Sequence, residues 1–553
     1  VNYQDEIFRT ARTQNYSLGF LGGSDNLKYS MSLNYFNQEG VIKETNYDRF
    51  NMRVKSDYKK GIFKIGETIL LTKEKRKELP GIPGQGSNVL GAAITMIPGF
   101  AIYDENAIGG YGGASGSVTD IFNPVAALNL FDVTSDTYQA LINTYVEATF
   151  LKDFKYKLNV GATVSEFKRD NYTPRYEVGG FFKNLDNDLV HTDEFNLYTQ
   201  VENTLNYTKS FGKHYVNALA GYTVYNNGFK SVVSSVSGIP DDIYVLAGAV
   251  QPAVTGYNLE NNLVSYLGRA IYSYDNKYTL SATIRRDGSS RFSPENKWGN
   301  FPSVSAAWGL GKETFFTNLN TPITDLKLRA SYGVLGNQEI GDYQYLGLIT
   351  SGISYGVGEP NTLWSGNIQT NSPGVGLKWE STETADFGLD LDLWNGKVQY
   401  TFDYFNKQTS DLLLRVPIPL SVGSSENPYT NAGNVTNKGY EMSLTYNEKI
   451  GDFNFNVTGN FSSIKNNVDE LSTGSQVLEG SRGAFHGAPI TYSKVGYPIY
   501  SFFLVDTDGL FRSQAEIDAH TKNGTLIQPN AQVGDVRYVD YNGDGEINGE
   551  DRQ

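Results

Sequence analysis

Apolar and polar residues alternate with a period of two over many short segments of this chain. In residues 278–284 every second side chain is apolar, and residues 28–35, 155–164 and 397–404 follow the same rule. This alternation predicts β-strands that carry one apolar face and one polar face. A helical period of useful length occurs only at 514–521. The pattern therefore predicts an all-β protein built from consecutive hairpins.

Weaker versions of the pattern extend the prediction to roughly sixteen strands. Several approach the length of about nine to eleven residues that a tilted strand needs to cross a bilayer, whereas strands of soluble sandwiches and propellers usually have about five or six residues. The expected strands are residues 16–21, 28–35, 50–58, 62–71, 138–150, 155–164, 195–207, 215–225, 263–274, 278–284, 303–310, 326–335, 385–393, 397–404, 440–446 and 453–461.

The connections between these strands alternate strictly between short and long. Tight turns such as 22–26, 59–61 and Asn395-Gly396 follow one end of the strands, and residues 312–324 are the one longer member of this short set. Because consecutive antiparallel strands place alternate connections on opposite rims, one rim carries only turns and the other only loops. Outer-membrane barrels have this asymmetry, with short periplasmic turns and long extracellular loops. The long loops are expected at 37–48, 75–137, 168–194, 227–261, 287–301, 336–380, 409–438 and from 467 onwards.

The fold class that this pattern predicts is a large antiparallel transmembrane β-barrel, since closure also hides the edge strands. Aromatic residues make up 13% of the chain, and its 38 Tyr suit membrane–water interfaces, although they also suit sugar-binding surfaces. The mean hydropathy is −0.38, and no apolar run reaches about 18 residues. A bundle of transmembrane helices is therefore excluded.

The charge and cysteine counts narrow the classes of chemistry and partner. The chain has no Cys, which excludes disulfides, thiolate metal sites and thiol nucleophiles. Its net charge is −14, from 46 basic and 60 acidic residues, which argues against nucleic acid as a partner.

The start of the chain indicates that it is a piece of a longer protein. No signal peptide is visible, and Val1 directly precedes barrel-like sequence. Residues 16–21 run towards a short turn, so strand parity requires a strand of the opposite direction before them. That strand is expected either within residues 1–12 or upstream of this chain.

Short motifs are distributed over the whole chain, and their number and order are more specific than any one of them. The most specific piece is DGSSRF at 287–292, followed by WG at 298–299 and FPS at 301–303. The others are DEIFRTA at 5–11, YFNQEG at 35–40, NYDRF at 46–50, NPVA at 123–126, LRASYG at 328–333, GNQ at 336–338, WE at 379–380 with Thr384, NAG at 431–433, NKGYE at 437–441 and GDVRY at 534–538.

With these motifs in this order, the chain resembles the barrel of SusC/RagA-like TonB-dependent outer-membrane transporters of Bacteroidetes-type bacteria. The resemblance implies a 22-stranded barrel whose N-terminal plug and last strands are not in this chain. It interprets residues 5–11 as the entry from plug to barrel. The expected organisation is one partial barrel over residues 1–553, with strands and loops at 1–466 and a long extracellular loop region at 467–553.

The resemblance also implies an activity and partners. A SusD-like surface lipoprotein would cover the barrel mouth, and TonB, acting through the missing N-terminal region, would energise release of the substrate. The substrate would be an oligosaccharide or oligopeptide too large for ordinary porins, and the location would be the outer membrane of a Gram-negative bacterium. The expected protein is a transporter and not an enzyme.

Residues 540–551 fit the twelve-residue calcium loop closely. Side-chain oxygens fall at positions 1, 3, 5, 9 and 12, and Gly545 occupies position 6, where the loop turns sharply. Position 12 is Asp rather than Glu, whose longer arm closes the site in a bidentate way. The alternative is an Asp/Asn/Gly-rich surface turn. The candidate ligands of Ca²⁺ are Asp540, Asn542, Asp544, Glu546, Asn548 and Asp551.

The sequence gives little support to catalysis. Residues 352–356 match the hydrolase motif G-x-S-x-G, but no helix is expected after them, and the four His are far apart in sequence. Scattered carboxylates cannot be paired from sequence, so a glycosidase pair is unsupported. Loop aromatics suit sugar or peptide binding, but girdle or loop packing is the preferred interpretation for most of them: Tyr103, Tyr111, Trp298, Tyr355, Trp364, Tyr429 and Phe485.

Two other functions fit parts of the pattern. A passive porin or a surface adhesin would use the same barrel, and a plug with a TonB box upstream would argue against both. A soluble carbohydrate-binding β-protein is the third hypothesis, and solubility without detergent would support it.

Overall fold

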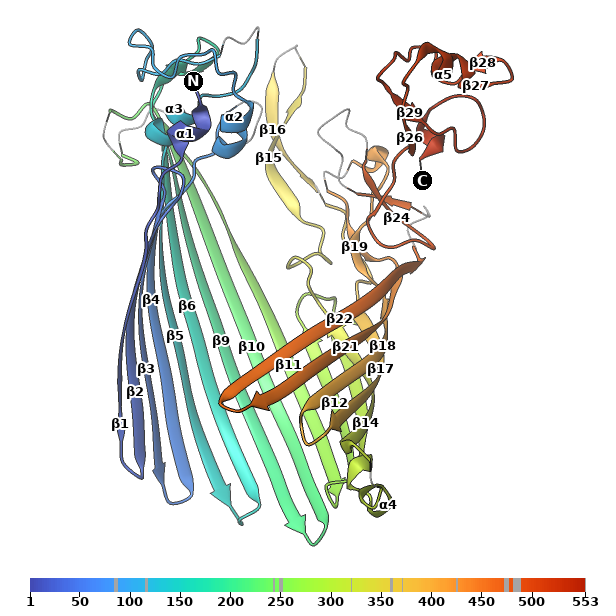
Figure 1. Ribbon diagram of the computed structural model, residues 1–553. Coiled ribbons are helices and arrows are strands. Elements are labelled where there is room, and N and C mark those ends of the chain that lie inside the picture. Colours follow the sequence, from blue (N-terminus) through green and yellow to red (C-terminus); the bar gives the residue numbers. More distant parts are fainter. Residues whose placement is uncertain are drawn as a thin grey trace. The chain divides into compact units, whose positions relative to one another are not determined.

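The computed structural model describes residues 1–552 apart from short gaps (Figure 1). The residues outside the description are 84–87, 115–117, 242–243, 248–251, 320, 359–361, 370, 424–425, 472–476, 481–488 and 553.

Sixteen strands form one large antiparallel sheet in which the strands follow one another in chain order. The sheet contains all sixteen strands that the alternation predicts, so the predicted fold class is confirmed. The strands are β1 (Thr13–Gly23), β2 (Leu27–Glu39), β3 (Asn46–Lys60), β4 (Phe63–Lys77), β5 (Asp132–Phe150), β6 (Phe154–Thr173), β9 (Asp188–Phe211), β10 (His214–Ser237), β11 (Ala253–Tyr274), β12 (Tyr278–Ser289), β13 (Trp298–Gly309), β14 (Ile323–Asn337), β17 (Glu380–Leu393), β18 (Val398–Ser410), β21 (Asn434–Ile450) and β22 (Phe453–Glu470).

Most strands extend beyond their predicted ends, and the longest extensions run into the long loops. Strand β9 has 24 residues, where alternation predicts 195–207, and β10 also has 24. Strand β22 reaches Glu470, so the last loop region begins after that residue rather than at 467. Beyond the bilayer neither face of a strand must be apolar, so backbone pairing continues where the alternation stops.

The short turns use left-handed backbone, as tight hairpins require. Leu151 and Lys152 have φ of 50° and 64°, and Asp275 and Asn276 have 53° and 54°. The predicted turn at Asn395-Gly396 has φ of 57° and 86° at those two residues. These conformations match the right-handed twist of the flanking strands, so they hold consecutive strands in register.

The chain divides into two compact units. The first consists of Val1–Lys209, Asn217–Gly268 and Asp287–Ser290, and the second of Ser210–Val216, Arg269–Arg286 and Arg291–Gln553.

The smaller elements lie in the connections. The helices are α1 (Tyr3–Ile7), α2 (Val89–Thr95), α3 (Pro124–Leu130), α4 (Thr314–Thr317) and α5 (Gln514–Ala519), with 3-10 turns η1 (Leu310–Lys312), η2 (Leu420–Val422) and η3 (Gly549–Asp551). The small strands are β7 (Tyr176–Val178), β8 (Phe182–Asn184), β15 (Ile349–Gly356), β16 (Leu363–Gln369), β19 (Leu413–Arg415), β20 (Tyr429–Asn431), β23 (Val477–Glu479), β24 (Thr491–Lys494), β25 (Ser501–Phe502), β26 (Thr507–Leu510), β27 (Thr521–Lys522), β28 (Thr525–Leu526) and β29 (Val536–Tyr538).

Helix α5 confirms the one helical pattern in the sequence, and the pattern missed α1 to α4. All five helices have seven residues or fewer, so a helical period is at the limit of detection in each of them. No helix in the described ranges is long and apolar enough to cross a membrane.

Residues 1–12 form the helix α1 and an extended segment, not the strand that parity allowed there. The segment lies against the loop between β2 and β3. The Arg9 backbone N–H donates to Val41 O at 2.8 Å, and its guanidinium donates to Gly40 O and Thr45 O, both at 2.9 Å. These contacts place residues 5–11 beside the connection between β2 and β3, and their interpretation as the entry from plug to barrel stays a prediction.

The longest connection on the short-turn side joins β13 to β14 and contains η1 and α4. Glu313 anchors it: its carboxylate accepts hydrogen bonds from the Tyr278 hydroxyl, from Trp308 Nε1 at 3.1 Å and from Lys277 Nζ at 3.1 Å. These hydrogen bonds, that of Tyr278 first, lower the pKa of Glu313 to about 2. The carboxylate therefore ties the connection to the neighbouring turn through most of the pH range.

Glu313→Gln is expected to destabilise the folded barrel at neutral pH, because it removes the charge that three donors bind. The folded pKa of Glu313 lies below the usual value of 4.5, so this contribution is present above about pH 4.5 and disappears as the pH falls towards 2. Thermal unfolding of the detergent-solubilised protein from pH 7 to pH 3 measures it. The gap between wild type and variant should close on acidification, while Asp452→Asn, in another short turn, should show no such closing. A gap independent of pH would contradict the assignment.

Candidate functional site

The strands of the second unit separate an apolar face from a polar face. Leu328 on β14 faces Leu389 on β17, and their neighbours in sequence are polar. Arg329 Nη2 lies 3.0 Å from Asp390 Oδ1 and 2.9 Å from Asp403 Oδ1. In a membrane barrel the apolar face meets lipid and the polar face meets the lumen. The ion pairs of Arg329 therefore identify the lumen side of these strands.

The first unit repeats this division on β3, β4 and β5. Met52 pairs with Leu71, which pairs with Ala140, and Val54 pairs with Ile69 on the same face. Arg53, the residue between Met52 and Val54, points to the opposite face. The alternation predicted for residues 50–58 and 62–71 is thus realised as an apolar surface across several strands.

Aromatic side chains form rows beside the short turns in each unit. In the first unit, the ring centroids of Phe150 and Phe154 are 5.7 Å apart, and those of Phe154 and Tyr207 are 4.8 Å apart. In the second, Tyr278 stacks on Trp308 at 6.2 Å. Amphipathic rings of this kind occupy the headgroup level of membranes, and outer-membrane barrels carry such girdles. The rows mark a membrane–water boundary at the turn end of the strands.

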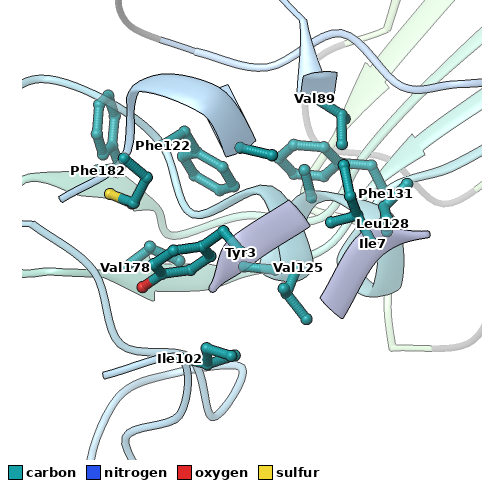
Figure 2. Packing of buried hydrophobic residues seen from close by; sticks show 14 of the residues in the cluster. Tyr3, Ile7, Val89, Ile102, Phe122, Val125, Leu128, Phe131, Val178 and Phe182 are labelled. Atoms are coloured by element: carbon teal, nitrogen blue, oxygen red, sulfur yellow. The ribbon is translucent and has the colours of Figure 1, made fainter. Parts of the chain in front are cut away.

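The long loops of the first unit have a hydrophobic core of their own. Helices α1, α2 and α3 and the hairpin β7–β8 enclose Phe122, whose side chain is fully buried (Figure 2). Its ring lies 5.5 Å from Phe131 and 5.3 Å from Phe182, centroid to centroid. Figure 1 shows these elements together with the N-terminus beyond the ends of β3 to β6. The loop rim is therefore a packed structure with a defined surface.

Asn123, the first residue of the NPVA motif, holds this loop core together. Its fully buried side chain donates to Ile102 O at 2.9 Å and to Gly112 O at 2.8 Å. Its Oδ1 caps α3 by accepting from Val125 N and Ala126 N. Proline at the first position of α3 suits the helix start, because no N–H is needed there. One side chain thus satisfies four backbone groups, which explains the motif without a ligand.

The motifs of the second unit also meet in one packed cluster. Trp379 stacks against Phe292 at 5.2 Å and Phe301 at 5.3 Å, and its Nε1 donates to Lys297 O at 2.9 Å. Arg291 Nε lies 2.9 Å from Asp342 Oδ1. Arg291 and Phe292 therefore join the stretches FPS and WE in linking loops that are far apart in sequence. Their recognisable residues serve the packing of the loop rim.

Two further motifs close the same region. Asn431 donates to Lys378 O and Asp411 O, both at 2.9 Å, and accepts from Lys378 N at 3.0 Å. Glu380 accepts from Asn337 Nδ2 at 3.1 Å and from Leu413 N at 3.0 Å. These side chains supply partners to backbone groups where loops leave the sheet.

A comparable polar hub in the first unit carried no signal in the sequence. The buried Asn187 donates to Ile239 O at 2.9 Å and to Asp241 Oδ1 at 2.8 Å, and Arg175 Nη2 lies 2.8 Å from Asp241 Oδ2. The hydrogen bond from Asn187, followed by the charge of Arg175, lowers the pKa of Asp241. The hub ties the loop at 174–187 to the loop after β10. Its residues lie in unrelated stretches, so only the folded chain brings them together.

The loop aromatics divide between packing and exposure. Tyr103 stacks on Tyr111 at 5.5 Å, and the Arg286 and Arg415 guanidinium groups lie over Trp298 and Tyr429 at 5.1 Å and 4.9 Å. Four of them thus have ring or cation contacts within the loops, although Tyr103 remains 63% and Trp298 43% exposed. Tyr355 and Trp364 pair across β15 and β16 and are 52% and 56% exposed. Phe485 lies outside the described residues.

The G-x-S-x-G match lies in strand β15, with φ of 81° at Gly352 and a register shift between Ser351 and Ile353. Ser354 pairs with Ser365 of β16. A hydrolase elbow needs a strand, a sharp turn and a helix, and the described residues around Ser354 form a hairpin instead.

The loop at 540–551 is closed by its own hydrogen bonds. Asp551, fully buried, accepts from Tyr541 N at 2.9 Å and Asn548 N at 2.8 Å, and Asp540 Oδ2 accepts from Gly545 N at 2.9 Å. Asp544 accepts from Glu546 N at 2.8 Å; that bond first, and then the Asn542 amide, lowers the pKa of Asp544. The loop therefore favours the ionised form of the Asp544 carboxylate.

The six candidate ligands of this loop do not form a preorganised metal-binding site. Among the described residues no group of three or more His, Cys, Asp or Glu side chains is placed to hold a metal ion. Asp540 Oδ1 is the exception in the loop: it is a buried oxygen without a hydrogen-bond partner. Carboxylate and amide oxygens suit a hard cation such as Ca²⁺, so the donor set fits that ion.

The fold and its two faces define the class of protein, a large outer-membrane-type β-barrel with packed outer loops. Residues 86–549 match the family described as TonB dependent receptor-like, beta-barrel, and the chain belongs to this family. It is a SusC/RagA-like member, as its motifs indicate.

The chain is similar to several named proteins over its whole length. It is 33% identical to TonB-dependent receptor P3 of Formosa agariphila and 28% identical to TonB-dependent receptor SusC of Bacteroides thetaiotaomicron, covering 100% of this chain and 55% of each relative. A solved structure of the RagAB peptide transporter superimposes with a TM-score of 0.81 at 21% identity, over 100% of this chain and 59% of that chain. The chain thus spans little more than half the length of the relatives it matches.

Asn123→Ala is expected to loosen the loop core while leaving the sheet intact. It removes a helix cap worth about 1 kcal/mol and leaves two carbonyls without their donors, for a total of about 3 kcal/mol. Hydrogen–deuterium exchange should therefore show a loss of protection of about 100-fold in α2 and α3 and little change in the strands. Asn106→Ala, an exposed amide in the same loop, serves as the control. Unchanged protection in α3 of the Asn123 variant would refute the role given to this side chain.

Proposed function

We propose that the full protein imports a large nutrient, an oligosaccharide or oligopeptide, across the outer membrane by TonB-dependent active transport. The family match over residues 86–549 carries this proposal. The apolar strand faces and the aromatic rows beside the turns support the membrane location, because they have the arrangement of a barrel surface in lipid. The short turns would then face the periplasm and the long loops the exterior.

The proposed complex includes a SusD-like surface lipoprotein and TonB. The name RagAB and the relative SusC support a two-component importer, since both belong to systems that this chain resembles. The packed loop rim supports the same assembly: a lid needs a defined surface to close against, and Phe122 and Trp379 give the loops of the two units their own buried cores. TonB would act through a region that lies upstream of Val1.

The polar strand face supports passage of a hydrophilic substrate. On that face Arg329 forms ion pairs with Asp390 and Asp403. Such pairs keep the lumen wall polar and hydrated, and they limit its local net charge. The family is one of receptors and transporters, so the protein's proposed work is binding and passage rather than bond making.

The test is a pull-down of the full-length protein from detergent-solubilised outer membrane, followed by mass spectrometry. Co-purification of a SusD-like lipoprotein is the expected result, and growth on single glycans or peptides by a deletion strain then identifies the substrate. A barrel recovered without lid or plug would favour a porin or adhesin. Recovery in the soluble fraction alone would overturn the membrane location.

We further propose that the loop at 540–551 binds Ca²⁺ through Asp540, Asn542, Asp544, Glu546, Asn548 and Asp551. The unpartnered Asp540 Oδ1 supports this, because a buried carboxylate oxygen without a hydrogen bond is costly unless a cation neutralises it. The ion would supply charge neutralisation and order to the loop. Asp551 would either release its backbone hydrogen bonds and bind the ion directly, or keep those hydrogen bonds and stabilise the loop without contacting the ion.

Removal of calcium is expected to lower the order of residues 534–552, and Asp540→Asn should weaken binding by at least about tenfold, because affinity follows the charge and number of the ligands. Terbium luminescence measures binding, and hydrogen exchange with and without chelator measures order. Asp518→Asn, an exposed carboxylate on α5, is the control. A loop whose exchange is unchanged by chelator and by calcium would rule the site out.

A further inference from the structure

The apolar face of the second unit contains a hollow close to the short turns. It has a volume of about 720 Å³ and lies over strands β11 to β14 and β17. It is lined by Tyr278, Leu280, Trp308 and Phe387. The exposed fractions of Tyr278, Leu280 and Phe387 are 45%, 56% and 50%. The hollow is thus an open, apolar groove on the surface that the proposed function assigns to lipid.

The strand register explains why the face is hollow at this place. Ala306 of β13 pairs with Ala330 of β14, and Ala330 pairs with Phe387 of β17. Towards the turns, the next pair on the same face is Trp308 with Leu328. Two adjacent methyl groups therefore form a floor between bulky walls. Elsewhere on β13 the same face is filled, since Val304 pairs with Tyr332.

The turn end of the groove is polar and carries both signs of charge. Tyr278 and Trp308, which line the groove, donate to Glu313, and Lys277 Nζ lies 3.1 Å from the same carboxylate. The exposed Lys312 reaches back to Asn276 O at 3.2 Å. At its turn end the groove therefore meets the ammonium groups of Lys277 and Lys312 and the carboxylate of Glu313, which is hydrogen-bonded by the aromatic residues of the groove wall.

The neighbouring turn extends this platform. Lys213 Nζ lies 2.8 Å from Asp275 Oδ2, and the Asp275 backbone N–H donates to Lys213 O at 2.7 Å. Beyond it, Phe315 and Leu319 of the β13–β14 connection are 60% and 53% exposed. Exposed apolar side chains beside lysines are typical of an element that lies at the headgroup level of a membrane.

We propose that this groove binds one phospholipid with a zwitterionic headgroup of the phosphatidylethanolamine type. An acyl chain would lie on Ala306 and Ala330 between Leu280, Trp308 and Phe387. The lysines, Lys312 first, would donate to the phosphate, and the carboxylate of Asp275 would accept from the headgroup ammonium, while Glu313 holds the aromatic walls in place. Three lysines beside two carboxylates suit a headgroup with both charges better than a purely anionic one.

The inference rests on the proposed function, because a phospholipid reaches this groove only if the short turns face the phospholipid leaflet. Outer-membrane barrels place short turns on the periplasmic side. The bound lipid would fill a gap in the barrel wall next to the longest turn, and so hold that turn at a fixed depth.

The experiment is native mass spectrometry of the full-length protein, released from detergent after delipidation and titration with phosphatidylethanolamine. Wild type should retain one lipid, and Ala306→Phe, which fills the floor, should retain at least about tenfold less, since the ring removes the space for the chain. Val304→Phe, on the same face of β13 and outside the groove, should behave as wild type. Lys312→Gln tests the headgroup contact without altering the sheet, and it should also lower lipid retention. This second variant keeps the test valid if Ala306→Phe does not assemble.

Equal retention by wild type, Ala306→Phe and Lys312→Gln would overturn the proposal, as would a preference for phosphatidylglycerol or for lipid A. A protein that enters the outer membrane with its lipoprotein but retains no lipid would overturn this inference alone. A protein that is absent from the outer membrane would instead overturn the proposed function.

Discussion

The hydrogen bonding of the backbone is the constraint on which the rest of this structure depends. In a bilayer every N–H and C=O must find a partner within the protein, and strands can meet that requirement only by pairing on both sides. The fourteen inner strands of the sheet meet it, and pairing in chain order needs only a turn or a loop between neighbours. Residues with a left-handed backbone conformation, such as Lys152 and Asn395, make the short turns tight. The long strands, the alternating rims and the apolar face follow from the same requirement.

Outside the bilayer water satisfies the backbone, and the loops are organised by side chains instead. Asn123 and Asn431 each bind several backbone groups of segments far away in sequence, and Asn187 does the same without belonging to any recognisable motif. Trp379 supplies the apolar counterpart in the second unit. The residues by which the chain is recognised thus stabilise the loop rim.

The two charged features outside the strand faces differ in how they satisfy their carboxylates. Glu313 is bound by three side-chain donors, and its low pKa shows how strongly they hold its charge. In the loop at 540–551 both oxygens of Asp551 and one oxygen each of Asp540 and Asp544 accept backbone N–H groups, while Asp540 Oδ1 has no hydrogen-bond partner. The first arrangement is complete without a ligand and fixes a turn. The second leaves a buried oxygen for a cation, which is why calcium is proposed there.

The sequence by itself determined the strands, their order and the class of fold, because a bilayer imposes a period of two that each strand displays locally. It also determined the family, through motifs such as residues 287–292. Tertiary structure alone decided which rim holds residues 1–12, how far strands such as β9 extend, and which side chains meet in the loops. Arg175, Asn187 and Asp241 come from separate stretches without a shared pattern, and the groove over Ala306 and Ala330 exists only because the register places two alanines side by side. Such features depend on cross-strand and loop-to-loop neighbours, which no local pattern specifies.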